Sequence, residues 1–84
     1  MIKVLYFARL KESLKYSIED LTLPQGVNDI SALKAHLASR GGAWQEMFAG
    51  QQIVRAAINH SVVADNTIIN DGDEVAFFPP VTGG

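Results

Sequence analysis

The N-terminal residues alternate in a way that predicts a β-strand. Ile2, Val4 and Tyr6 fall on one face of an extended chain, and Leu5 and Phe7 fall on the other. A period of two residues is typical of strands, and apolar groups on both faces are typical of a strand with neighbours on either side. We therefore expect a first strand that lies inside a sheet.

The next stretch predicts a helical turn followed by a second strand. Leu10 and Leu14 are four residues apart, which places them on one side of a short helix. Residues 17–23 are rich in β-formers and end at Pro24-Gln25-Gly26, a sequence that favours a turn. We expect this strand to pair with the first.

One full-length helix is predicted in the middle of the chain. Ile30, Leu33 and Leu37 share one helical face, Asn28 or Asp29 can cap its N-terminus, and Gly41-Gly42 can end it. Residues 43–48 add a short turn in which Trp44 and Phe48, four apart, are expected to pack under the sheet edge.

The C-terminal half predicts three further strands. Residues 53–58 and 61–64 form a hairpin around Asn59-His60, because Asn tolerates the left-handed backbone that a tight turn requires. Asp71-Gly72-Asp73 forms the last turn and residues 75–78 the last strand. Element order alone indicates one α+β domain over residues 1–80.

The end of the chain cannot continue a sheet. Pro79-Pro80 removes two successive backbone donors, so pairing should stop after Phe78. Residues 81–84 are then expected to form a flexible tail without bulky groups at Gly83-Gly84. From Pro79 the chain can reach roughly 20 Å at about 3.3 Å per residue, which is enough to enter a pocket on another protein.

Composition excludes several kinds of function. The formal net charge is −2 and the seven basic residues are dispersed, so we expect no nucleic-acid partner. The chain has no cysteine, its two histidines lie in no ligand-spaced cluster, and no Gly-rich phosphate-binding motif occurs. We expect no metal, no bound cofactor and no autonomous catalysis. No signal region or membrane-spanning run is evident, so a cytoplasmic location is expected.

The last fourteen residues, DGDEVAFFPPVTGG, resemble the end of the small subunit of molybdopterin synthase, a ubiquitin-like sulfur carrier. Residues 4–10, VLYFARL, resemble the start of that family. The resemblance implies a β-grasp fold: a mixed sheet of about five strands, one main helix, and the last strand beside the first.

The same resemblance implies a chemistry for the terminal residue. A separate adenylating enzyme would use ATP to convert the Gly84 carboxylate into an acyl-adenylate, and a sulfur donor protein would displace AMP to leave a thiocarboxylate. The large subunit of the synthase would receive the tail, and the resemblance implies an assembly of two small and two large subunits. The tail that enters partner active sites together with Gly84 would consist of Pro80, Val81, Thr82 and Gly83.

Strand alternation adds a candidate docking surface. Val75 and Phe77 share one face of the last strand, and Ala76 and Phe78 share the other. If the helix covers the first face, Phe78 can anchor a partner together with Leu5 and Phe7. The competing interpretation is that residues 8–16 cover Phe78.

Three other functions remain open. A thiamine-pathway sulfur carrier is disfavoured by chain length and by Phe78-Pro79-Pro80. A ubiquitin-like modifier would join Gly84 to lysine side chains, and a plain interaction module would use its tail without any chemistry.

Overall fold

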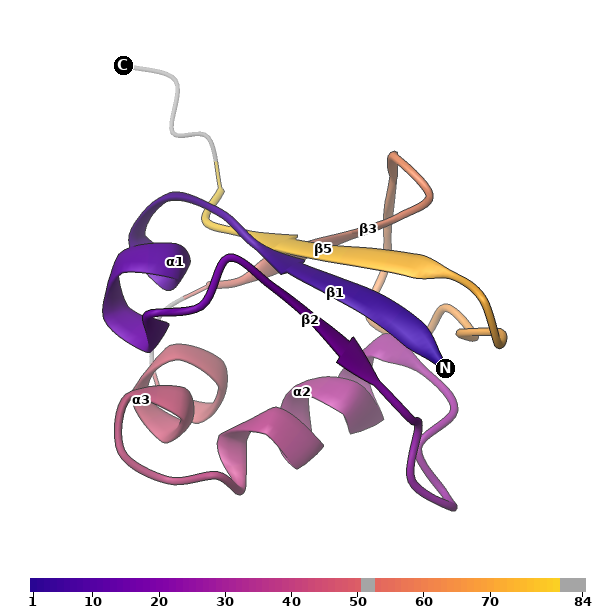
Figure 1. The fold of residues 1–84 in the computed structure, drawn as a ribbon, viewed down its shortest axis with the longest axis horizontal. Coiled ribbons are helices and arrows are strands. Elements are labelled where there is room, and N and C mark those ends of the chain that lie inside the picture. Colours follow the sequence, from indigo (N-terminus) through magenta and orange to yellow (C-terminus); the bar gives the residue numbers. More distant parts are fainter. Residues whose placement is uncertain (51–52, 81–84) are drawn as a thin grey trace.

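The computed structural model describes residues 1–50 and 53–80, which form a five-stranded sheet with helices on one side (Figure 1). The strands are β1 (Ile2–Tyr6), β2 (Ile18–Leu21), β3 (Arg55–Ile58), β4 (Ser61–Val63) and β5 (Glu74–Phe78). The helices are α1 (Ala8–Leu14), α2 (Ile30–Ala38) and α3 (Ala43–Ala49). None of these helices, within the described part of the chain, is long and apolar enough to cross a membrane.

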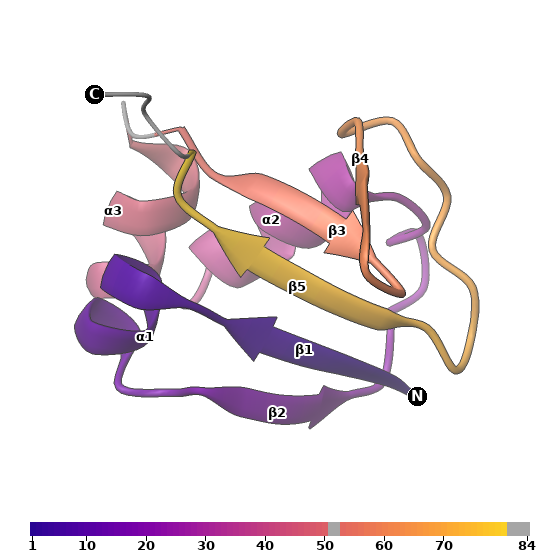
Figure 2. The ribbon, with the colours of Figure 1, turned by 90° about the horizontal axis from the view of Figure 1, so that it is seen from above.

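The sheet has the order β2-β1-β5-β3-β4, so the last strand lies at its centre (Figure 2). β5 runs parallel to β1 and antiparallel to β3. A parallel pair requires a long crossover connection. Here the connection is the whole chain between β1 and β5, with its three helices and three other strands. The expected pairing of the first two strands and of the last strand with the first is confirmed, as is the mixed α+β sheet.

β2 is shorter than the predicted strand over residues 17–23. Its pairing with β1 runs from Leu5 opposite Ile18 to Ile2 opposite Leu21, where β1 has almost reached the chain's start. Leu23 has no strand partner and packs, partly buried, against the core. A strand's length is therefore limited by its neighbour as well as by its own residues.

The main helix begins as predicted and ends earlier than predicted. Asp29 is the N-cap, and its carboxylate accepts a hydrogen bond from the Ala32 amide at 2.8 Å. α2 ends at Ala38, after which the Arg40 and Gly41 amides bond to carbonyls three residues back. Gly41, at φ +79°, then turns the chain toward α3.

The core fills the space between the sheet and the helices. Alternate strand residues point into it: Ile2, Val4, Tyr6, Ala56, Val75 and Phe77. The helices contribute Leu10, Leu14, Ile30, Leu33, Leu37 and Met47. Trp44 and Phe48 stack as a pair at 6.2 Å, as their spacing predicted. They contact Tyr6 of β1, and Phe48 also contacts Phe77 of β5, so they lie beneath the central strands and not at the edge.

Two tight turns have the backbone geometry that their sequences indicate. Asn59 and His60 both have positive φ, at 49° and 75°, which is the mirror-image turn that suits a two-residue hairpin. Gly72 has φ +88°, and the Asp73 carboxylate accepts a hydrogen bond from the Asn70 amide at 2.8 Å. This second turn delivers the chain into β5 beside the N-terminus.

Candidate functional site

The tail begins at the end of the central strand. The last described pair in the β5 ladder is Arg55 opposite Phe78. Pro79 and Pro80 follow, half-buried and outside the strand, as expected for residues without backbone donors. The predicted tail residues 81–84, including the predicted reactive Gly84, lie outside the described residues. Their roles, and that of Pro80, remain predictions.

One face of the sheet has no helix against it; we call it the open face. It carries the alternate residues Lys3, Leu5, Phe7, Ile18, Asp20, Arg55, Ala57, Val62, Glu74, Ala76 and Phe78. Figure 1 shows the helices gathered on the opposite side of the strands. A sheet with one covered and one uncovered face normally has polar residues on the uncovered one. Much of the open face departs from that rule.

An apolar row crosses the open face through all five strands. The strand registers place these residues side by side in the order Ile18, Leu5, Ala76, Ala57 and Val62. The two ends of the row, Ile18 and Val62, are 49% and 66% exposed. Apolar side chains aligned in this way form a continuous patch, which on a small protein is typical of a contact with another macromolecule.

The three predicted docking residues meet on this face. Phe77 is fully buried in the core whereas Phe78 is half-buried on the other side of β5, so the predicted alternation is confirmed. Leu5 belongs to the apolar row. Phe7 is 47% exposed, its backbone is extended, and its amide donates to the Phe77 carbonyl at 3.1 Å, which holds it beside the end of β5.

The helix within residues 8–16, α1, packs against β5 as well as against α3. The buried side chains of that helix, Leu10 and Leu14, join the core on the helical side of the sheet. Phe78 is half-buried on the opposite face of β5, next to the residues where the tail begins, and its cover by residues 8–16 stays a prediction.

Sequence reasoning missed Ile18, Val62 and Arg55 as members of this surface. Alternation within β2 and β4 marks the first two as residues on one face, but only the register shows which face that is. Arg55 stands at the start of β3, and nothing in its local sequence reveals that it lies opposite Phe78.

Polar residues occupy the end of the open face that is distant from the tail. The register places Lys3 between Asp20 of β2 and Glu74 of β5. His60 lies 2.9 Å from the Glu74 carboxylate, and the Asn59 side-chain amide bonds to Asp73 at 3.0 Å. The open face therefore changes from apolar near the tail to mixed charges at the far end.

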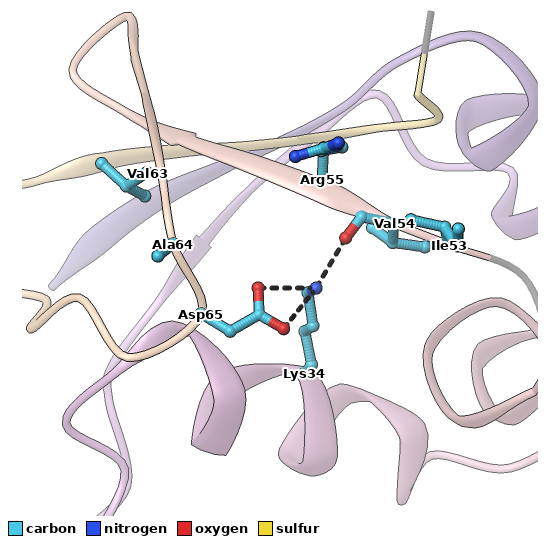
Figure 3. A pocket seen from close by; sticks show the side chains of 7 residues that line it. All are labelled: Lys34, Ile53, Val54, Arg55, Val63, Ala64 and Asp65. Atoms are coloured by element: carbon cyan, nitrogen blue, oxygen red, sulfur yellow. Dashed lines mark hydrogen bonds and ion pairs between the residues drawn. The ribbon is translucent and has the colours of Figure 1, made fainter. Parts of the chain in front are cut away.

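A cavity of about 390 Å³ lies between α2 and the β3–β4 hairpin. Figure 3 shows Lys34 reaching across it from α2. The Lys34 ammonium donates to the Val54 carbonyl at 2.6 Å and to both Asp65 carboxylate oxygens at 3.0 Å. These three bonds use all three donors of the ammonium, so the contact is best explained as a structural tie between helix and sheet.

A second titratable group is buried beneath the sheet. The Tyr6 hydroxyl has no hydrogen-bond partner among the described residues, although the ion pair of Glu19 and Arg40 is close. Burial, reinforced by the negative charge of Glu19, raises the pKa of Tyr6 well above its usual range. Tyr6 packs against Trp44, over which the Arg40 guanidinium lies at 4.3 Å from the ring centre. The phenol stays neutral near pH 7 and belongs to the core.

The described residues contain no cluster of side chains that could hold a metal ion. No group of three potential ligands among His, Asp and Glu occurs in residues 1–50 and 53–80. His36 lies half-buried on α2, and His60 lies exposed in the hairpin turn. What the structure does present is a row of apolar residues on an uncovered sheet face, next to the start of the tail.

Comparison with known proteins gives matches along the whole chain. Residues 4–84 match the family model described as "ThiS family". The "Molybdopterin synthase sulfur carrier subunit" of Escherichia coli (strain K12) is 37% identical over 84 residues, which is 100% of both chains.

Solved structures with the same arrangement include two informative ones. SAMP1 from Haloferax volcanii superposes with a TM-score of 0.75 at 23% identity, covering 99% of this chain and 98% of that one, which supports the fold alone. A chain from the protein–protein complex of subunits 1 and 2 of molybdopterin-converting factor from Helicobacter pylori 26695 gives a TM-score of 0.65 at 25% identity. That match covers 99% of this chain and 97% of the other.

Proposed function

Because this chain belongs to the ThiS family, and because its E. coli relative is a molybdopterin synthase sulfur carrier subunit, we propose that it carries sulfur on Gly84 for that synthase. The body binds partners and the tail brings one terminal atom to the reacting centre. The observation that carries this proposal is the apolar row with Phe78 at the tail's root, joined to a Gly-Gly end. A docked body holds the terminal atom near the reacting centre and so removes most of the entropic cost of bringing it there.

The terminal carboxylate must be activated before it can accept sulfur. In the proposed sequence an adenylating partner transfers AMP from ATP to the Gly84 carboxylate and releases pyrophosphate. The outer sulfur of a persulfide on a sulfur donor protein then attacks the acyl carbon and AMP leaves, which joins the terminus to the donor through an acyl disulfide. A second thiol reduces that S–S bond, so the terminus is released as a thiocarboxylate and the donor sulfur is left in a disulfide. ATP binds to the partner, because this chain has no phosphate-binding motif in its sequence.

The second partner is the large subunit of the synthase. The H. pylori neighbour is a complex of subunits 1 and 2 of molybdopterin-converting factor, which supports a partner of this kind for the present chain. The large subunit would hold the cyclic pyranopterin precursor and provide acid and base groups, and successive thiocarboxylates would deliver the two dithiolene sulfurs. The present chain contributes the docking surface and the sulfur.

The proposed function is tested by the mass of the intact protein purified from its own cells. A sulfur carrier shows a fraction of chains in which one terminal oxygen is exchanged for sulfur, and fragmentation places the exchange at Gly84. Blotting for lysine-linked conjugates tests the modifier alternative. A population that contains only carboxylate termini, also when the activating enzyme and sulfur donor are supplied, would contradict sulfur transfer and favour a plain interaction module.

Replacing Phe78 by alanine should weaken binding to the large subunit while leaving the fold intact. Phe78 is half-buried on the open face, and aromatic anchors of interfaces cost roughly 2 to 4 kcal/mol when they are truncated. Isothermal titration calorimetry with the purified large subunit measures the change. Ile68→Ala, at a 57% exposed apolar residue in the loop between β4 and β5, is the matched control and should bind like the parent chain. If Phe78→Ala binds the large subunit as tightly as Ile68→Ala and the parent chain do, Phe78 is not part of the interface.

A further inference from the structure

Charge is distributed unevenly over the open face. At the end distant from the tail, Lys3 lies between Asp20 and Glu74, so positive and negative groups alternate along the row. At the tail end Arg55 lies directly opposite Phe78, and the neighbouring row is the apolar one through Leu5 and Ala76. Arg55 thus places a positive charge in the apolar half of the surface.

Arg55 differs from two other basic residues of the fold. Lys34 is tied to Asp65 at 3.0 Å and Arg40 to Glu19 at 2.7 Å. Arg55 is exposed and forms no ion pair or side-chain hydrogen bond with any residue in 1–50 or 53–80. Figure 3 shows its side chain on the side of β3 away from Lys34, which agrees with the alternation that assigns Arg55 to the open face.

A partner that covers Phe78 must also come close to Arg55. Directly opposite residues on one sheet face have Cβ atoms about 4.5 to 5.5 Å apart. Removing a guanidinium from water without a counter-charge costs free energy. A carboxylate on the partner offsets this cost, because it can accept two parallel hydrogen bonds from the guanidinium. A partner with an acidic side chain at this position is therefore favoured, and one with an apolar or basic side chain there is rejected.

We propose that Arg55 determines partner specificity on the open face by binding a carboxylate of the synthase large subunit beside the root of the tail. This inference rests on the proposed function, since it takes the large subunit as the occupant of the apolar half of the open face, which excludes the charged row of Lys3. The apolar row and Phe78 supply contact area, and Arg55 supplies charge recognition. Complementary charge also speeds encounter and makes it sensitive to salt.

The test compares Arg55→Met with Lys3→Met, a matched pair on the same face. Binding of the purified chain to the purified large subunit of the same organism is measured by calorimetry at low and at high salt, and thermal melts check the fold. Arg55→Met should raise Kd about 10-fold and Arg55→Glu on the order of 100-fold, because each leaves a buried carboxylate unpaired or repelled. Arg55→Lys should fall between the parent and Arg55→Met, since it keeps the charge and loses the paired hydrogen bonds. Lys3→Met should bind nearly as the parent does.

Salt dependence separates charge recognition from simple packing. The affinity of the parent chain for the large subunit should fall as the salt concentration is raised. The affinity of Arg55→Met should fall much less over the same range. The inference is overturned if Arg55→Met binds as the parent does, if Lys3→Met loses as much, or if Arg55→Met keeps the full salt dependence. If the parent chain itself does not bind the large subunit, the proposed function fails, and this inference fails with it.

Discussion

The chain that lacks Gly84 should show almost no ATP–pyrophosphate exchange with its adenylating enzyme. The deletion moves the terminal carboxylate back by about 3.3 to 3.6 Å, which is the length of one residue. A displacement of only about 1 Å at a reacting centre can already cost on the order of 10²-fold in rate. This is the largest effect on activity that we expect from any single change in the chain.

A companion variant separates tail length from tail width. Gly83→Val keeps the carboxylate at its normal distance but adds a β-branched side chain and removes glycine's conformational freedom, so exchange should also be severely reduced. Thr82→Ser keeps the length and both glycines and should exchange nearly as the parent does. The core residues lie between Ile2 and Phe77, so all three variants should melt like the parent. Parental exchange by the Gly84 deletion would refute the carrier mechanism.

Phe77→Ala should cause the largest loss of stability. Phe77 is fully buried on the central strand, in a stacked contact with Tyr6 at 6.3 Å and an edge-to-face contact with Phe48 at 5.1 Å. Truncation of a buried Phe removes apolar burial and leaves a cavity that the core cannot fully close, at a cost of about 3 to 5 kcal/mol. Most domains have a total stability of about 5 to 15 kcal/mol, so the variant should be close to unfolding.

Urea unfolding followed by tryptophan fluorescence measures this effect, because Trp44 lies in the same aromatic cluster as Phe77. Phe78→Ala is the matched control one residue away, and its unfolding free energy should change much less, since the half-buried ring faces away from the core. If Phe77→Ala leaves stability unchanged while Phe78→Ala unfolds the protein, the two faces of β5 have been assigned the wrong way round.

The two phenylalanines also show how far sequence reasoning extends to the site. Alternation places Phe77 and Phe78 on opposite faces wherever β5 lies in the sheet, because successive side chains of a strand point in opposite directions. Which face is covered depends on where α2 and α3 pack. Their apolar stripes require a partner face, and Val75 with Phe77 is the more apolar choice than Ala76 with Glu74.

Local chemistry determines several elements without any tertiary contact. The Asp29 cap, the left-handed turn at Asn59-His60 and the break at Pro79-Pro80 each depend on the conformational preferences of a few adjacent residues. Such preferences depend only on residues that are adjacent in the sequence. The sequence by itself therefore determined the element order, the α+β class and the point where the tail begins, and its resemblance to a carrier family indicated the pairing of the first and last strands.

Only the tertiary structure decided which residues from distant segments share a surface. The row from Ile18 to Val62 and the pairing of Arg55 with Phe78 depend on strand registers across the whole sheet. A shift of one residue in a register would turn every side chain of that strand to the other face, so the correct register is fixed by burying all the core residues at once. No local segment contains that information, because the free energy that selects the register comes from contacts between residues far apart in the chain.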